Sequence, residues 1–237
     1  MTRTMQQAEE LLAAVEKNGV QMQVGFVRRF DPEWMKWREQ ILADKIGRPV
    51  SWRNANASFG APSPWFNQEE QGDGPFMDGC IHNIDFALYT FGPAKWAFLN
   101  GRSMRDGNTA LDTGTATVRF ESGDEMMLAW SWGLPSGSTG GGIFDFLGPK
   151  GTLIYSSDKG PKWKENHLVL DYGETQEAEQ IPFTSDLDAA FGAQMDEFIA
   201  VARGETLPRA GGKEGLASMK LVLAILESGR TGEVVHL

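Results

Sequence analysis

The sequence predicts an α+β fold built on a mostly antiparallel sheet, and three observations carry this prediction. Apolar and polar residues alternate in short stretches between residues 94 and 171, as is typical of half-buried strands. Two of these stretches are joined by Ser-Gly-Asp at residues 122–124, a short hairpin turn. Helical periodicity precedes this region and returns over residues 187–228. Strands and helices that are segregated along a chain favour an α+β architecture.

The N-terminal segment predicts one helix and one strand. Thr4 and Gln7 form a capping-box pair, and apolar residues follow at helical spacing. Gly19 then stands where a glycine commonly ends a helix. Residues 21–26 (QMQVGF) form a short strand candidate. A helix followed by a strand, with no strand before them, is half of an α/β repeat.

A second helix is predicted to begin at Asp31-Pro32 and to run to about Ala43. An aspartate can cap a helix, and a proline fits its first turn. The following elements are a strand over residues 50–58, a loop rich in Gly, Pro and Ser over 60–74, and a helix over 76–91 that Gly92-Pro93 ends.

The second half of the chain is predicted to supply most of the sheet. Two helices close the chain, and there are too few helices to cover both faces of six or more strands, so we expect helices on one face. The strands are expected over residues 94–102, 113–121, 125–132, 143–147, 152–155 and 167–171, and the closing helices over 187–202 and 213–228.

Composition excludes several classes of protein. The 237 residues include 22 Lys and Arg against 32 Asp and Glu, a formal net charge of −10, which argues against a nucleic-acid binder. The longest apolar runs fall far short of the roughly 20 residues of a membrane span. One cysteine, Cys80, cannot form an internal disulfide and is expected to be a small buried hydrophobe. We therefore expect a soluble, cytoplasmic protein.

The motif richest in chemistry contains Asp78, His82 and Asp85. Their spacing of i, i+4 and i+7 places them on one face if the segment is a single helix. A carboxylate one turn from an imidazole can orient the ring and raise its basicity, as a general acid/base requires. The spacing leaves two alternatives open: a surface pair without function, and a zinc or iron site made of one histidine and two carboxylates. We expect no metal.

Three strings resemble the glucose–fructose oxidoreductase/inositol dehydrogenase (Gfo/Idh/MocA) family. They are VGFVRRFDP at residues 24–32, GPFMDGCIHNID at 74–85, and residues 214–235, which begin EGLA and end AILESGRTGEVV. The D-x-x-x-H-x-x-D motif within the second string is the most specific of them. The strings appear in the family's order, and the resemblance covers nearly the whole chain.

The resemblance implies an N-terminal Rossmann domain and a C-terminal α+β domain built on a large open sheet. It also implies hydride transfer between NAD or NADP and a hydroxyl carbon of a sugar or cyclitol. On this resemblance His82 is the acid/base that takes the hydroxyl proton, and Asp78 orients His82 or holds a substrate hydroxyl. The substrate is thus expected to be a small polyol or sugar.

The chain also departs from the family. No G-x-G-x-x-G fingerprint is present, and the family's Glu-Lys-Pro lysine normally lies just before the stretch that begins here at Met1. We expect residues 1–26 to be a remnant of the dinucleotide-binding domain and residues 27–237 to be the substrate-binding and oligomerisation domain. Such a chain, a fragment of a longer enzyme or a reduced form, should not bind NAD or NADP tightly or turn over alone.

Three further residues are candidate substrate contacts: Asp85 of the motif, Trp65 and Arg29. Trp65 lies in the Gly-rich loop, where it can stack on a sugar face or simply pack down. Arg28 and Arg29 can contact a substrate or cofactor, or form an interdomain salt bridge. A non-catalytic module for oligomerisation or carbohydrate binding is the alternative to an enzyme domain.

The tryptophans predict how the sheet is used. Trp130 and Trp132 share one face of a strand, and Trp52 and Trp96 lie on other strands, which suggests an exposed aromatic sheet face. In the resembled family the open face commonly packs against a second subunit, so we expect a dimer or tetramer. The alternative is a sheet that the chain's own helices cover.

Overall fold

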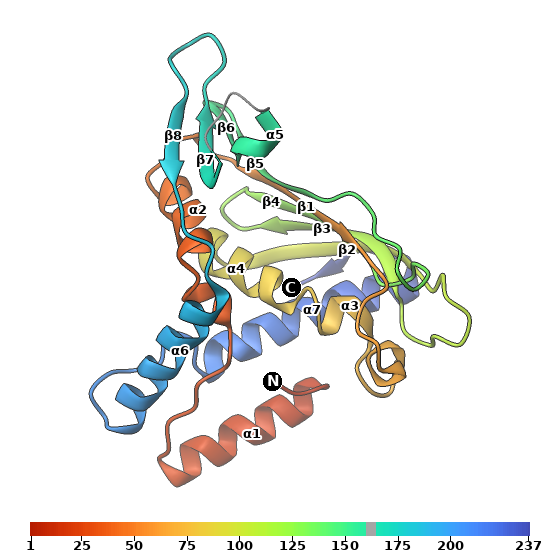
Figure 1. Ribbon diagram of the computed structural model, residues 1–237. Helices are drawn as coiled ribbons and strands as arrows, with labels where there is room; N and C mark the ends of the chain where they lie inside the picture. The colour runs from red at the N-terminus through yellow and green to blue at the C-terminus, as the bar shows by residue number, and fades with distance from the viewer. Residues whose placement is uncertain (160–164) are drawn as a thin grey trace.

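The computed structural model describes residues 1–159 and 165–237, and a nine-stranded sheet dominates it (Figure 1). The strand order is β8-β7-β6-β5-β1-β4-β3-β2-β9. Only β1 and β4 pair in parallel among the described strands, and the other neighbours are antiparallel. The predicted α+β class with a large, mostly antiparallel open sheet is therefore confirmed. The strands are β1 Ser51–Ala57, β2 Ala94–Arg102, β3 Thr113–Phe120, β4 Glu125–Ser131, β5 Ile143–Gly148, β6 Gly151–Tyr155, β7 His167–Asp171, β8 Glu179–Pro182 and β9 Val235–His236.

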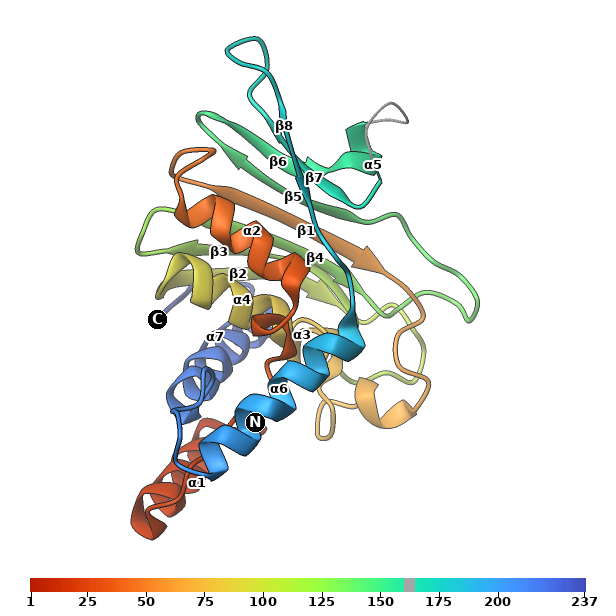
Figure 2. The same ribbon diagram turned by 60° about the vertical axis from the view of Figure 1, so that its left-hand side comes forward.

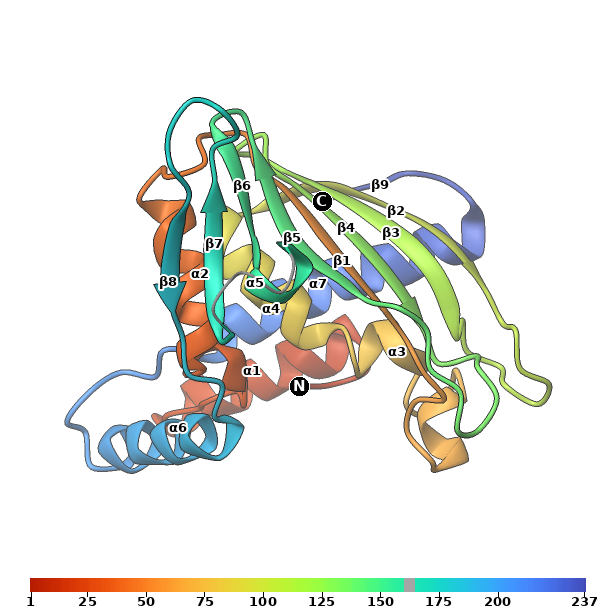
Figure 3. The same ribbon diagram turned by 45° about the horizontal axis from the view of Figure 1, so that its top comes forward.

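The longer helices lie on one side of this sheet, as predicted (Figures 2 and 3). α2, α4 and α7 cover the sheet face, while α1 lies beyond α7 on the side away from the strands (Figure 1). None of the described helices has the length and hydropathy needed to cross a membrane. The helices are α1 Met5–Asn18, α2 Pro32–Leu42, α3 Gly74–Met77, α4 Ile81–Phe91, α5 Ser156–Lys159, α6 Leu187–Ala202 and α7 Gly212–Thr231, with 3₁₀ turns η1 Val27–Arg29 and η2 Pro64–Asn67.

The core between sheet and helices is largely aromatic. Trp52 of β1 and Phe146 of β5 stack at 5.3 Å between ring centroids, and Trp34 of α2 meets Phe86 of α4 edge to face at 4.9 Å. Trp52, Phe86 and Phe146 are fully buried. This packing fixes α2 and α4 against the centre of the sheet, where β1 and β5 are neighbours.

The N-terminal prediction holds for the helix and fails for the strand. Thr4 accepts a hydrogen bond from the Gln7 amide, the Gln7 side chain completes the capping box, and Gly19 ends α1 in the left-handed region at φ +60°. Residues 21–26 form no strand, because no described strand lies beside them to supply a ladder. A single backbone hydrogen bond, from Val24 to the Ala210 carbonyl, ties this segment to the loop before α7.

The helix expected over residues 76–91 is broken in the structure. α3 ends at Met77, residues 78–80 form a turn, and α4 begins at Ile81. Gly79 lies against Trp132 so closely that a Cβ there would meet the ring at 2.8 Å. The single helical face expected for Asp78, His82 and Asp85 is therefore wrong, because a turn separates the first from the other two.

The expectation of an exposed aromatic sheet face is also wrong. Trp52 and Trp132 are buried, and Trp130 is half-buried on the helical side; only Trp96 alternates outward on β2. The open face instead carries polar residues of β1, β3, β4 and β5, including the ion pairs Arg119–Glu125 and Arg53–Asp145. Alternation shows that a strand has two faces, but not which of them the helices cover.

Candidate active site

A cleft of about 400 Å³ opens on the helical face of the sheet, and it contains the predicted histidine. We call it the His82 cleft. His82 and Asn83 at the start of α4 line it from one side, and residues of β1, β4, β5 and β6 form its floor. The lining residues are Arg28, Trp34, Asn54, Ala55, Asn56, Gly79, His82, Asn83, Trp130, Gly142, Ile143, Phe144, Tyr155 and Asp158.

His82 is held so that it can accept a proton. Its ring packs edge-on against Phe26, with ring centroids 6.4 Å apart. The buried Nδ1 atom has no hydrogen-bond partner among the described residues. Burial, and then the positive charge of Arg28, lower the pKa of the imidazole below its usual value near 6.5. The ring is therefore mostly neutral at pH 7, which is the state a general base requires.

Arg28 reaches the cleft from η1. Its guanidinium lies over the Trp34 ring at 4.8 Å from the centroid, and Nη1 donates to Asp31 at 2.6 Å. Asp31 also caps α2, because its side chain accepts from the Glu33 amide at 3.1 Å. The RRFDP string thus folds into one unit in which Asp31 starts a helix and orients Arg28.

The sheet supplies polar groups that the sequence analysis did not single out. Asn54 is 3% exposed, yet its Nδ2 has no hydrogen-bond partner in the described part of the chain, and the same holds for Nε1 of Trp130. Asn56 lies on the same cleft wall. Buried donors without partners are uncommon, and in a cleft a ligand or an ordered water can supply the missing acceptor. A signal was present: Asn54 and Asn56 occupy the same alternating positions as buried Trp52.

Asp78 does not lie where the sequence analysis placed it. It follows α3, is exposed, and does not line the His82 cleft. No hydrogen bond or ion pair joins it to His82 within residues 1–159 and 165–237, and burial raises the pKa of its carboxyl group. Its role in orienting His82 or a substrate hydroxyl stays a prediction, and the intervening turn at Gly79 is the reason for the separation.

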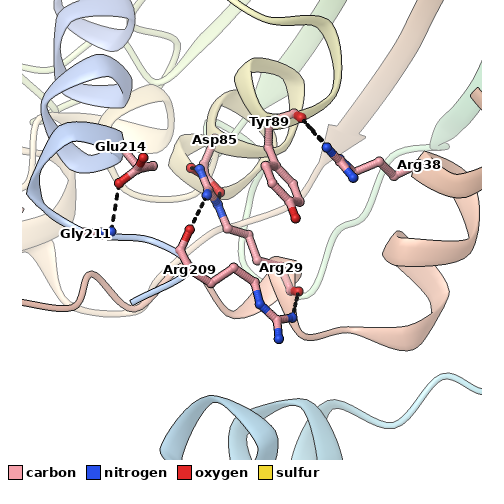
Figure 4. A network of polar contacts seen from close by, with 7 residues as sticks. All are labelled: Arg29, Arg38, Asp85, Tyr89, Arg209, Gly211 and Glu214. Atoms are coloured by element: carbon pink, nitrogen blue, oxygen red, sulfur yellow. Dashed lines mark hydrogen bonds and ion pairs between the residues drawn. The ribbon is translucent and has the colours of Figure 1, made fainter. Parts of the chain in front are cut away.

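Arg29 and Asp85 face each other (Figure 4), and neither lines the His82 cleft. Arg29 Nε and Nη2 donate to the two carboxylate oxygens of Asp85 at 2.9 and 2.7 Å, and both residues are buried. Burial raises the pKa of Asp85, and the Arg29 guanidinium opposes this effect. The structure thus joins both residues in a salt bridge outside the lining of the His82 cleft, and their expected contact with a substrate stays a prediction.

Trp65 also lies outside the cleft. It is 49% exposed on η2 and meets Phe66 edge to face, at 5.2 Å between centroids. Within the described residues, no group of three or more His, Cys, Asp and Glu side chains is placed to hold a metal ion.

Tyr155 completes the cleft wall, where its hydroxyl donates to the buried Glu33 carboxylate and burial raises the pKa of the Tyr155 hydroxyl.

The fold and the cleft together define an α+β domain: an open sheet with a histidine of lowered pKa and unpaired amide and indole donors beneath its helices. Comparison with known proteins gives this class a family. Residues 38–237 match the family described as "Oxidoreductase family, C-terminal alpha/beta domain". The chain belongs to the Gfo/Idh/MocA oxidoreductase family.

Individual relatives agree with this assignment. The chain is 23% identical to scyllo-inositol 2-dehydrogenase (NAD(+)) of Bacillus subtilis, over 100% of this chain and 68% of that protein. It is 25% identical to D-glucoside 3-dehydrogenase of Escherichia coli, over 99% of this chain and 70% of that protein. An oxidoreductase from Agrobacterium radiobacter, solved with NAD+, L-tartaric acid and magnesium, has the same fold: TM-score 0.81 at 15% identity, over 99% of this chain and 70% of that one.

Proposed function

We propose that this chain is the substrate-binding domain of an NAD(P)-dependent oxidoreductase that acts on a hydroxyl-bearing carbon of a sugar or cyclitol. The observation that carries the proposal is the His82 cleft, in which a neutral imidazole faces the same space as unpaired donors from β1 and β4. The names of the two curated relatives, an inositol dehydrogenase and a glucoside dehydrogenase, support the substrate class.

The residues of the cleft divide the work of binding from that of proton transfer. A hydroxyl oxygen of the substrate can accept from Asn54 Nδ2 or Trp130 Nε1, which removes the cost of leaving those donors unpaired. Trp34 and Phe144 offer flat apolar surfaces to the C–H face of a ring and keep water out. His82 takes the proton of the hydroxyl whose carbon is oxidised.

The chain's own residues do not fit a dinucleotide. No G-x-G-x-x-G fingerprint is present, and the N-terminal segment offers a helix without the strand that a nucleotide-binding crevice requires. We therefore assign only substrate binding and proton transfer to this chain. NAD or NADP belongs to the full-length enzyme in this proposal, and tight binding of either to residues 1–237 alone is not expected.

The test joins the dinucleotide-binding part of a relative to Met1 and measures NADH or NADPH formation with a panel of inositols and sugars. His82→Gln is expected to reduce turnover by about 10²–10⁴-fold, the usual contribution of a general base. His236→Gln is the matched control, since that histidine lies at the exposed end of the sheet on β9, and it should leave turnover unchanged. Undiminished turnover in His82→Gln would contradict the proposal.

A non-catalytic carbohydrate-binding module is the second candidate, because the unpaired donors and flat apolar side chains of the cleft would bind a sugar without any redox chemistry. It predicts that the fused protein binds sugars but forms no reduced dinucleotide with any of them. Binding can be followed by the fluorescence of Trp34 and Trp130, which line the cleft. Saturable quenching by a sugar, combined with no turnover in the fusion, would favour this candidate over the enzyme domain.

We also propose that the chain forms a dimer or tetramer through the open face of its sheet. None of the longer described helices covers that face (Figure 3), and half-buried Trp96 and Phe98 lie on it among polar residues. Light scattering measures the mass in solution. Replacing Trp96 and Phe98 together by serine should lower that mass, and an unchanged oligomer would place the interface elsewhere.

A further inference from the structure

We propose that Arg29 and Asp85 form a positioning pair, which fixes Arg28 and His82 relative to each other across the cleft. The inference rests on the proposed function of the cleft, but neither member of the pair lines the cleft. The pair joins η1, which carries Arg28, to α4, which carries His82.

The pair is held rigidly (Figure 4). The planar guanidinium of Arg29 meets the carboxylate of Asp85 through two parallel hydrogen bonds, which fixes both direction and distance. The remaining nitrogen, Nη1, donates to the Arg209 carbonyl at 2.6 Å, and Arg209 Nη1 donates to the Arg29 carbonyl at 2.8 Å. Side chain and backbone of Arg29 are thus both fixed.

The surroundings of the pair are fixed in turn. The Arg29 guanidinium lies 4.3 Å from the centroid of the Tyr89 ring, and Arg38 lies 3.7 Å from the same centroid and donates to the Tyr89 carbonyl at 3.0 Å. The loop before α7 is anchored where Gly211 donates to the Glu214 carboxylate at 2.9 Å (Figure 4). The pair therefore connects η1, α4 and the start of α7.

The chain positions explain how this arrangement reaches the cleft. Arg28 is the direct neighbour of Arg29, and His82 lies three residues before Asp85, about one helical turn away. In the described part of the chain, the two Arg29–Asp85 hydrogen bonds are the only ones that join η1 to α4. No hydrogen bond connects Arg28 to His82, so their relative position depends on η1 and α4, together with the contacts to Asp31 and Trp34 that orient the Arg28 side chain.

Stability alone does not account for such a pair. Removing two charges from water carries a desolvation penalty that their attraction often fails to exceed, so an apolar pair of similar volume would stabilise the fold as well. What a bidentate ion pair supplies beyond an apolar pair is a defined geometry. In this protein that geometry would set the distance between the guanidinium of Arg28 and the imidazole of His82.

The consequence can be measured, because the charge of Arg28 lowers the pKa of His82. A coulombic effect falls with distance, so it reports how close Arg28 is held. The other ionisable groups at the cleft are Asp158 at its rim and the Tyr155–Glu33 pair on its wall, with Asp31 bound to Arg28. All of these remain unchanged in every variant below, so their effects cancel.

The experiment is a cycle of histidine titrations by NMR on the chain as it stands. The sequence holds three histidines, so His167 and His236, both outside the cleft, serve as internal references. Arg28→Gln is titrated in the wild-type background and in an Arg29→Gln/Asp85→Asn background, which removes one charge of each sign. Arg28→Gln should raise the pKa of His82 in the wild type. In the second background that rise should fall to about half or less, as doubling the charge separation would produce.

Two further variants make the result decisive. Arg53→Gln/Asp145→Asn neutralises an ion pair of the same type on the open face and should leave the Arg28 effect at its wild-type size. Arg29→Lys keeps the positive charge but cannot make the two parallel hydrogen bonds to Asp85, so it should weaken the Arg28 effect. This variant also tests the inference if the doubly neutral variant fails to fold. An Arg28 effect that stays the same size in every folded Arg29 or Asp85 variant would overturn the inference.

The proposed function fails independently of this result. The titrations need no turnover, so a fused enzyme without activity would leave the positioning result intact. Conversely, a fused enzyme that depends on His82, combined with an Arg28 effect indifferent to the pair, would remove only the positioning role.

Discussion

Gly79→Ala tests how closely the turn before α4 is packed against the sheet. A Cβ at Gly79 would stand 2.8 Å from Cζ2 of Trp132 and 3.2 Å from the Pro75 carbonyl oxygen. Trp132 is 8% exposed and packs closely against Gly60 as well, where a Cβ would stand 2.3 Å from its Cγ, so the indole has little room to move. Gly79 has no positive φ, so packing rather than backbone strain opposes the substitution.

The size of the effect follows from this contact. Inserting one carbon into a close-packed site costs about 1–3 kcal/mol. For a domain of this size each kcal/mol shifts the melting temperature by about 2–4 °C, so Gly79→Ala should lower it by about 2–12 °C. The near-ultraviolet circular dichroism of Trp132 should change with it.

Gly192→Ala is the matched control, measured by the same thermal unfolding. Gly192 lies exposed within α6, and nothing stands within 4 Å of a Cβ built there. Alanine is the better helix former by about 0.5–1 kcal/mol, so this variant should melt about 1–4 °C higher. A Gly79→Ala protein that melts at or above the wild-type temperature, while Gly192→Ala behaves as expected, would refute the packing argument.

Three other predictions follow from the cleft and its surroundings. The pKa of His82 is lowered in the folded state, so the contribution of His82 to the free energy of unfolding is complete above pH 6.5 and is lost as the pH falls through the folded-state pKa. The urea concentration at the midpoint of unfolding should therefore fall as the pH is lowered from 8 to 5, and His82→Gln should reduce this dependence. Asn54→Ala in the fused enzyme should weaken substrate binding by roughly 2- to 12-fold, the value of one hydrogen bond, while Asn100→Ala at an exposed position of β2 should not. Phe191 and Met195 are 50% and 55% exposed along α6, so replacing both by serine should reduce self-association of the isolated chain in light scattering, and an unchanged mass would count against α6 as an adhesive surface.

The fold could be predicted from the sequence wherever local pattern decides the structure. The capping box of Thr4 and Gln7 needs only its own neighbours, and it formed as expected. Residues 21–26 did not form a strand, because a strand needs a partner that lies elsewhere in a chain. The helix over residues 76–91 failed for a related reason: the contact of Gly79 with Trp132 joins positions 53 residues apart, which periodicity cannot register.

The residues of the candidate site could likewise be predicted only where a local sequence pattern indicates them. His82 could be singled out because the motif that contains it resembles a family; its spacing from the two carboxylates alone left other interpretations open. Its supposed partner Asp78 was misplaced, because the argument assumed an unbroken helix. Asn54 and Trp130 were missed as cleft residues, because an asparagine on a strand becomes informative only when its burial and its unpaired donor are known.

The two halves of the cleft are held by different kinds of interaction, and this gives them different sensitivities. Asn54 and Trp130 stand on β1 and β4, whose backbone ladder fixes them whatever the helices do. Arg28 and His82 stand on η1 and α4, which meet through one buried ion pair and the packing of Arg29 over the Tyr89 ring. A change at the Arg29–Asp85 pair should therefore alter proton transfer more than substrate affinity, whereas a change on β1 should do the reverse. Such a separation would not arise if the cleft were one uniformly packed unit, because any disturbance would then affect both properties together.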